Sequence, residues 1–167
     1  MTFSELSKYF EKLEGTSSRL ALIDILSDLF KHASKDEIDK IVYLTQGRIA
    51  PFFEPLEIGM AEKSVAQALA VAYGSDKERV LALYNKLGDM GLVAEDMNKR
   101  HPRENEDRFS IKSRMTVPDV FETLTKIAKT SGEGTVGKRQ TLLSDLLKRL
   151  EPISAKHLVR IPLGNTR

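Results

Sequence analysis

Apolar residues recur at steps of three and four positions along almost the whole chain, and this spacing restricts it to helical folds. The pattern is clearest in residues 3–13, 117–127 and 142–147, where one face of each segment is apolar. No run of residues alternates strictly between apolar and polar, as a half-buried strand does. We therefore predict an all-α helical bundle. The chain has 167 residues, a length that suits one domain with its own core.

Glycines and capping residues predict where the helices begin and end. Ser17 or Ser18 can cap a second helix, and the Ser34–Glu37 and Ser75–Glu78 pairs have capping-box spacing. The sequence GDMGLVAE near residue 90 is interpreted as a turn, and the polar segment 99–115 as an exposed loop. The predicted single domain runs over 1–167, with a first repeat at about 3–48, middle helices at about 60–98, that loop, and a second repeat at about 117–164.

Two parts of the chain resemble each other, which indicates an internal duplication. Leu26–Lys31 reads LSDLFK and Leu143–Lys148 reads LSDLLK, five identities in six positions at a spacing of 117. Gly47 and Gly164 match at the same spacing, and the apolar residues of the segments beginning at Phe3 and Val117 match at a spacing of 114. We predict two helix-loop-helix repeats related by a pseudo-twofold axis. Chance similarity between amphipathic helices is the alternative explanation.

Charge is unevenly distributed between the two ends of the sequence. Residues 1–98 hold 11 lysines and arginines against 16 acidic residues, whereas residues 99–167 hold 15 against 8. Such asymmetry is typical of a one-sided surface for a polyanion, although clustered surface charge would also produce it.

Without cysteine there is no disulfide and no thiolate nucleophile. No apolar stretch reaches the roughly 20 residues of a membrane span, so we expect no membrane partner and an intracellular location, cytoplasmic or nucleoid-associated.

Repeat-related connections supply the strongest candidate site. Gly132, Gly134 and Thr135 precede a predicted helix whose first turns contain Lys138 and Arg139. Glycine lets the backbone approach a phosphate closely, and the start of a helix favours an anion. The equivalent connection in the first repeat reads Gly-Thr-Ser-Ser-Arg at residues 15–19. Ordinary helix-to-helix turns have the same composition, so each connection alone leaves both readings open.

Other constellations favour no catalytic chemistry. GEGT at residues 132–135 lacks the spacing of a P-loop and follows no strand. The acid pairs Asp36/Asp39 and Glu95/Asp96 are expected on solvated faces. His101 and His157 lie among basic residues and are expected at the surface. We therefore predict no catalytic residue and no metal site.

At the level of whole motifs, the sequence resembles a known family. The segments FSELSKYFEKLEGTSSR, IVYLTQGRIAPFFEPLEIGMAEK, GDMGLVAE and VFETLTKIAKTSGEGTVGKRQTLLSDLLKRLEPISAKHLVRIPLG occur in this order. Together they resemble the N-terminal DNA-binding domain of ATP-dependent DNA ligases of the archaeal and eukaryotic replicative type. The resemblance implies a pseudo-twofold helical bundle that contacts the minor groove of nicked duplex DNA through its inter-helix loops, in replication, repair and recombination.

Carried over motif by motif, the resemblance implies a set of DNA contacts in four loops. The implied DNA-binding residues are Thr16, Ser18, Arg19, Gly59, Lys63, Gly132, Gly134, Thr135, Lys138, Arg139, Gly164 and Arg167. Two positions depart from the family pattern, since the family usually has a glycine in place of Ala61 and an apolar residue in place of Thr166.

The adenylation motif of these ligases, Lys-x-Asp-Gly, does not occur in the chain. The domain is therefore expected to bind DNA but to be no enzyme on its own and to hold no cofactor. ATP and Mg²⁺ are implied only for a parent enzyme, whose remaining domains are implied partners. Two alternatives stay open: a helical protein–protein interaction module that does not bind DNA, and a sequence-reading helix-turn-helix protein.

Overall fold

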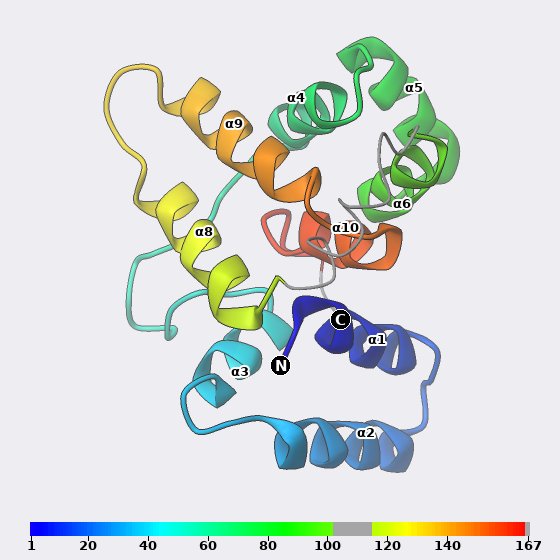
Figure 1. Cartoon of the computed structure of the whole chain (residues 1–167), viewed down its shortest axis with the longest axis vertical. Helices are drawn as coiled ribbons and strands as arrows, with labels where there is room; N and C mark the ends of the chain where they lie inside the picture. The colour runs from blue at the N-terminus through cyan, green and yellow to red at the C-terminus, as the bar shows by residue number, and fades with distance from the viewer. Residues whose placement is uncertain (102–114, 166–167) are drawn as a thin grey trace.

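The computed structural model describes residues 1–101 and 115–165, and these residues form nine α-helices and no strand. The all-α prediction is confirmed (Figure 1). The helices are α1 Phe3–Glu14, α2 Arg19–His32, α3 Ile38–Thr45, α4 Glu62–Ala72, α5 Lys77–Leu87, α6 Met90–Arg100, α8 Val117–Lys129, α9 Thr135–Leu147 and α10 Pro152–Arg160. Within this described part, no helix is both long and apolar enough to cross a membrane.

Helices α1 and α8 begin with the same device, at equivalent positions of the two repeats. Thr2 accepts the N–H of Glu5, whose carboxylate accepts the Thr2 N–H at 2.7 Å. Thr116 and Asp119 form the same capping box at a spacing of 114, with the Thr116 N–H 2.9 Å from the Asp119 carboxylate. The apolar face of each helix is buried, as the periodicity predicts. These caps are a signal of the repeat that the apolar spacing alone does not provide.

The segments that precede α1 and α8 pair with each other. The Phe3 N–H donates to the Met115 carbonyl at 2.8 Å, and the Val117 N–H donates to the Met1 carbonyl at 3.1 Å. The two hydrogen bonds are equivalent under the repeat: Phe3 corresponds to Val117, and Met1 corresponds to Met115, each at a spacing of 114. Packing shows the same equivalence, because α1 contacts α10 while α8 contacts α3. A local twofold axis between Thr2 and Thr116 accounts for both observations, and in Figure 1 the two three-helix sets lie on opposite sides of that point.

The middle helices break this symmetry, since they cover only the second repeat. Helix α4 packs on α9, and α6 packs on α10. The α6–α10 approach is close at Gly91, where an added Cβ would lie 2.8 Å from the Lys156 carbonyl oxygen and 2.7 Å from the Arg160 Nε. The segment GDMGLVAE is therefore mainly the first turns of α6, capped by Asp89, rather than only a turn. Two glycines, Gly88 and Gly91, suggested that no helix forms here. Gly88 does end α5, but Gly91 lies inside α6 and permits its close packing on α10.

Predicted boundaries also differ from the structure at three places. Glu37, not Ser34, is the N-cap of α3, and it makes no side-chain cap hydrogen bond. Asp76, not Ser75, caps α5, because its carboxylate accepts the Arg79 N–H at 2.8 Å. The predicted loop 99–115 is shorter at both ends: α6 continues to Arg100, and Met115 is 3% exposed in the core. The rest of that prediction, residues 102–114, lies outside the described residues.

Gly91→Ala should destabilise the protein by about 1–3 kcal/mol, because the new methyl group has to displace main chain or the Arg160 side chain. Gly137→Ala is the matched control. Gly137 lies in the first turn of α9, and apart from its chain neighbours and the backbone of its own helix, no atom of the described residues lies within 4 Å of the position that an added Cβ would take. That variant should gain about 0.5–1 kcal/mol from reduced freedom of the unfolded chain. Urea unfolding measures both, and equal stability of the two variants would contradict the close α6–α10 packing.

Candidate nucleic-acid interface

The α8–α9 connection is built around two glycines with left-handed backbone. Gly132 has φ 88° and Gly134 has φ 72°, a region that other residues rarely adopt. Thr135 donates its hydroxyl to the Gly132 carbonyl, which closes the turn. No side chain among the described residues caps α9, so the first N–H groups of this helix face outward without a side-chain acceptor. Lys138 is exposed one turn further on.

The equivalent α1–α2 connection has a side-chain cap and lacks a counterpart of Glu133, the exposed acid before α9. The Thr16 hydroxyl accepts the Ser18 N–H at 3.1 Å, and the Ser18 hydroxyl accepts the Ala21 N–H at 3.4 Å. Arg19 is exposed at the first position of α2. The first turns of α2 and α9 hold no acidic residue, whereas those of α1 and α8 do. Because acids stabilise helix starts and bases do not, the two connections have a charge pattern that suits an external anion.

Arg139 is committed to main-chain carbonyls. Its guanidinium donates to the Thr130 oxygen at 3.0 Å, to the Ala128 oxygen at 3.3 Å and to the Gly59 oxygen at 3.5 Å. These bonds tie the end of α8 to the segment before α4. Its implied DNA contact stays a prediction, and the geometry shows a residue that holds two of the implied loops together.

The structure gathers some of the implied residues and leaves others apart. Gly59 and Gly164 line one groove of about 350 Å³, and Arg139 adjoins it through the Gly59 carbonyl. Lys63 follows shortly after Gly59 in the sequence and is exposed in the first turn of α4. The α1–α2 connection lies at the opposite end of the molecule from the α8–α9 connection (Figure 1). Arg167 lies outside the described residues.

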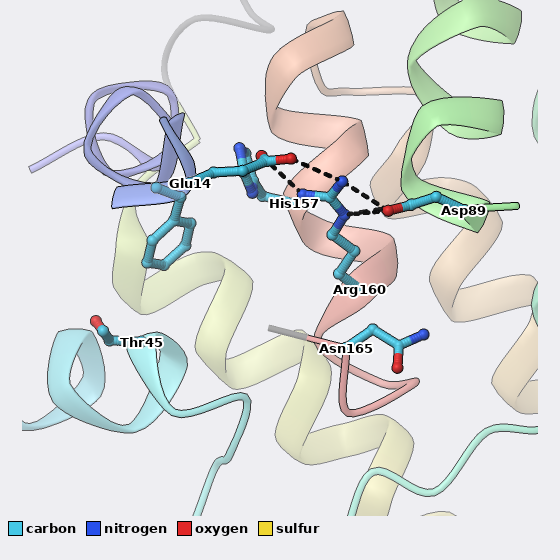
Figure 2. Close-up of a pocket in the computed structure, with 7 residues that line it drawn as sticks. Glu14, Thr45, Asp89, His157, Arg160 and Asn165 are labelled. Atoms are coloured by element: carbon cyan, nitrogen blue, oxygen red, sulfur yellow. Dashed lines mark hydrogen bonds and ion pairs between the residues drawn. The ribbon is translucent and has the colours of Figure 1, made fainter. Parts of the chain in front are cut away.

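An ion cluster of buried bases and partly exposed acids joins α1, α6 and α10, and sequence reasoning missed it. Figure 2 shows Arg160 of α10 between Glu14 of α1 and Asp89 at the start of α6. Its nitrogens lie 2.9 Å from the Glu14 carboxylate and 2.7 Å from the Asp89 carboxylate. The Glu14 pKa falls to about 2, chiefly because of the hydrogen bond from Arg160. The only sequence signal is that three basic residues, Lys156, His157 and Arg160, lie on one short helix whose other residues are mostly apolar.

His157 belongs to the same cluster, so the prediction of a surface histidine is wrong. The residue is 6% exposed, with its Nε2 2.7 Å from the Glu11 carboxylate. Burial lowers the pKa of His157, so the neutral ring donates through Nε2 to Glu11. Neighbouring basic residues suggested exposure, whereas the helix turns this side chain toward Phe10, with ring centroids 5.4 Å apart.

Glu11, Glu14 and His157 offer ligand atoms within 4.8 Å of one another, which is the spacing of a metal site. The Lys156 ammonium, however, lies 2.6 Å from the Glu11 carboxylate and 2.9 Å from that of Glu14. It supplies the positive charge that a metal ion would bring, so these residues do not fit Mg²⁺. The cluster therefore fixes α1 against α10 rather than holding an ion.

Comparison with known proteins identifies the family. The family model for the DNA ligase N terminus matches residues 2–167. A probable DNA ligase of Dictyoglomus turgidum is 42% identical over the whole chain, a DNA ligase 2 of Thermofilum pendens 40%, and a DNA ligase of Sulfolobus acidocaldarius 38%. The chain spans 27–29% of the length of these three relatives. It belongs to the DNA ligase N-terminal family, as the sequence motifs indicate, and does not include the catalytic part of such an enzyme.

The ion cluster predicts how stability responds to pH. The folded protein disfavours protonation of His157, so its contribution is complete above the unfolded pKa of about 6.5 and declines as pH falls below it. Glu14 adds a second loss between pH 4.5 and about 2. The urea midpoint should therefore fall between pH 7 and pH 5.5, and fall less in His157→Gln, where Glu11, Lys156 and Arg160 are unchanged. An identical pH profile for the variant would show that the buried imidazole is not responsible.

Proposed function

We propose that this chain binds duplex DNA without sequence preference, as the N-terminal part of an ATP-dependent DNA ligase that acts in replication and repair. The main support is the pair of repeat-related helix starts, α2 and α9, each bearing a base and no acid. Backbone N–H groups, hydroxyls and basic side chains are the groups that hold phosphates. None of them reads a base, so affinity would come from charge neutralisation.

The separation of the two connections is compatible with one ligand. Two loops that are related by a twofold axis lie on opposite sides of that axis and at the same position along it. A duplex lying across the axis on that side meets both loops, one near each strand, because its two backbones are themselves related by local twofold axes. The groove that contains Gly59 and Gly164 is lined by turns of both repeats, and we take it as the centre of the proposed contact.

Sealing of the nick is left to the remaining parts of the parent ligase. The described residues do not fit ATP, because the chain lacks a Lys-x-Asp-Gly motif and the GEGT turn has no P-loop spacing. Lys156 likewise replaces a metal ion between Glu11 and Glu14. In the proposed assignment, ATP and Mg²⁺ serve the other domains, while this domain holds the nicked duplex.

One observation favours a second candidate, a protein–protein interaction module. Leu20 and Ile23 on α2 are 75% and 55% exposed. The residue equivalent to Ile23 on α9 is Gln140, which bonds Ser64 of α4 at 3.2 Å, so α4 covers this face in the second repeat. Among the described residues, no helix covers the equivalent face of α2 in the first repeat. An apolar docking face would be indifferent to salt, which separates it from DNA binding.

Titration of a nicked duplex at two salt concentrations tests the proposal. Affinity should fall steeply as salt rises, because phosphate contacts release counterions. Unrelated duplex sequences should differ little in affinity, and a hundredfold preference for one sequence would contradict this mode and favour a helix-turn-helix reader. Binding that is absent even at low salt would leave the interaction module as the better account.

Lys138→Glu should weaken duplex binding about 5- to 30-fold near 0.1 M salt and reduce the salt slope by about one. The control is Lys86→Glu, the same charge change at an exposed position on α5, which should change affinity less than about twofold. Arg139 is not a clean probe, because its loss would also release the Gly59 and Thr130 carbonyls. Fluorescence anisotropy measures the affinities. Equal losses in the two lysine variants would remove the α8–α9 connection from the interface.

A further inference from the structure

The groove beside Gly59 has two walls that are related by the internal repeat. One wall is the turn after α3 at Gly47, and the other is the turn after α10 at Gly164. The two glycines match at the spacing of 117 and both have φ 69°. Two equivalent turns that line one groove have to lie close to the axis that relates them. The segment 56–60 completes the lining.

Arg48 lies in this groove in a fixed pose. Its guanidinium carbon is 4.0 Å from the ring centroid of Phe52, and its Nε donates to the Ala50 carbonyl at 3.2 Å. Its two terminal nitrogens have no hydrogen bond or ion pair with residues 1–101 or 115–165. Arg139 and Arg160, by contrast, use their terminal nitrogens on carbonyls and carboxylates. Arg48 is thus held in place while its donors remain available to a ligand.

Phe52 is the platform that holds this guanidinium. Its side chain is 79% exposed, although a large apolar ring usually gains by burial. A planar guanidinium stacks well on an aromatic face, and the stack limits the rotamers that a free arginine would sample. The exposed ring therefore preorganises a cation at the groove.

We propose that Arg48 enters the minor groove of bound duplex DNA and that Phe52 is its positioning residue. This inference rests on the proposed function, and neither residue is among those that the family resemblance implies. Where a duplex is centred on a twofold axis, its phosphates lie to either side and the base edges face the axis. A guanidinium near the axis therefore faces the groove floor, where the negative potential of a narrow minor groove favours arginine.

The first test compares Arg48→Ala with Arg79→Ala, an exposed arginine on α5 that has no ion pair within the described residues. Arg48→Ala should weaken duplex binding about tenfold, and Arg79→Ala less than about twofold. Arg48→Lys, which retains the charge but not the planar stack, should also bind more weakly than wild type. Thermal unfolding followed by circular dichroism checks that each variant is folded.

A second test places the contact. Replacing G·C pairs by I·C pairs removes the amino group from the minor-groove floor and leaves phosphates and major groove unchanged. Wild type should bind the I·C duplex at least about twofold more tightly, and Arg48→Ala should lose that gain. A gain that persists in Arg48→Ala would overturn the minor-groove placement.

Phe52 is tested by coupling to Arg48. Phe52→Ala should weaken binding several-fold, Phe52→Tyr should restore it, and the double variant should bind no more weakly than Arg48→Ala alone. Additive losses would show that Phe52 does not act through Arg48. Wild-type binding that is unchanged in Arg48→Ala would overturn this inference alone, whereas failure of wild type to bind duplex at low salt would overturn the proposed function.

Discussion

Two main-chain hydrogen bonds hold the beginnings of α1 and α8 together at the point where the two repeats meet. Phe3 donates to Met115 and Val117 donates to Met1, so each repeat satisfies a backbone group of the other. Buried backbone groups need partners, and this exchange satisfies two N–H groups and two carbonyl groups at once. The connections that carry Arg19 and Lys138 are then related by the same axis.

The last helix of the second repeat buries basic side chains, whereas its counterpart α3 buries only apolar ones. Helix α10 lies between α1 and α6, yet it contains Lys156, His157 and Arg160. Such side chains are tolerated inside a protein only when each charge finds a partner, and Glu11, Glu14 and Asp89 supply those partners. Lys156 and Arg160 each pair with two acids, and both of them share Glu14. The cluster thus makes the orientation of α6 and α1 on α10 specific in a way that apolar packing alone would not.

Much of the fold could be predicted from local pattern, because helix periodicity and caps are properties of neighbouring residues. Ser18 caps α2 and the helix from Phe3 ends at Gly15, as predicted. Three features depend on residues that are distant in the sequence, and these were missed. Gly91 permits close packing on α10, Arg139 bonds carbonyls on two other segments, and His157 meets Glu11 at 2.7 Å. Each involves a partner 9 to 146 positions away, which no local spacing reveals.

Helices α4 and α6 pack on the second repeat, and this asymmetry bears on how the proposed complex would bind a nick, whose two sides differ. A binder with perfect twofold symmetry would contact a duplex equally in either direction, and so would not distinguish the 5′ side of a break from the 3′ side. Here the layer formed by α4, α5 and α6 packs chiefly against α9 and α10. Lys63 at the start of α4 consequently has no twin beside the first repeat. In the proposed complex, this one-sided layer is what would give the bound strand a polarity.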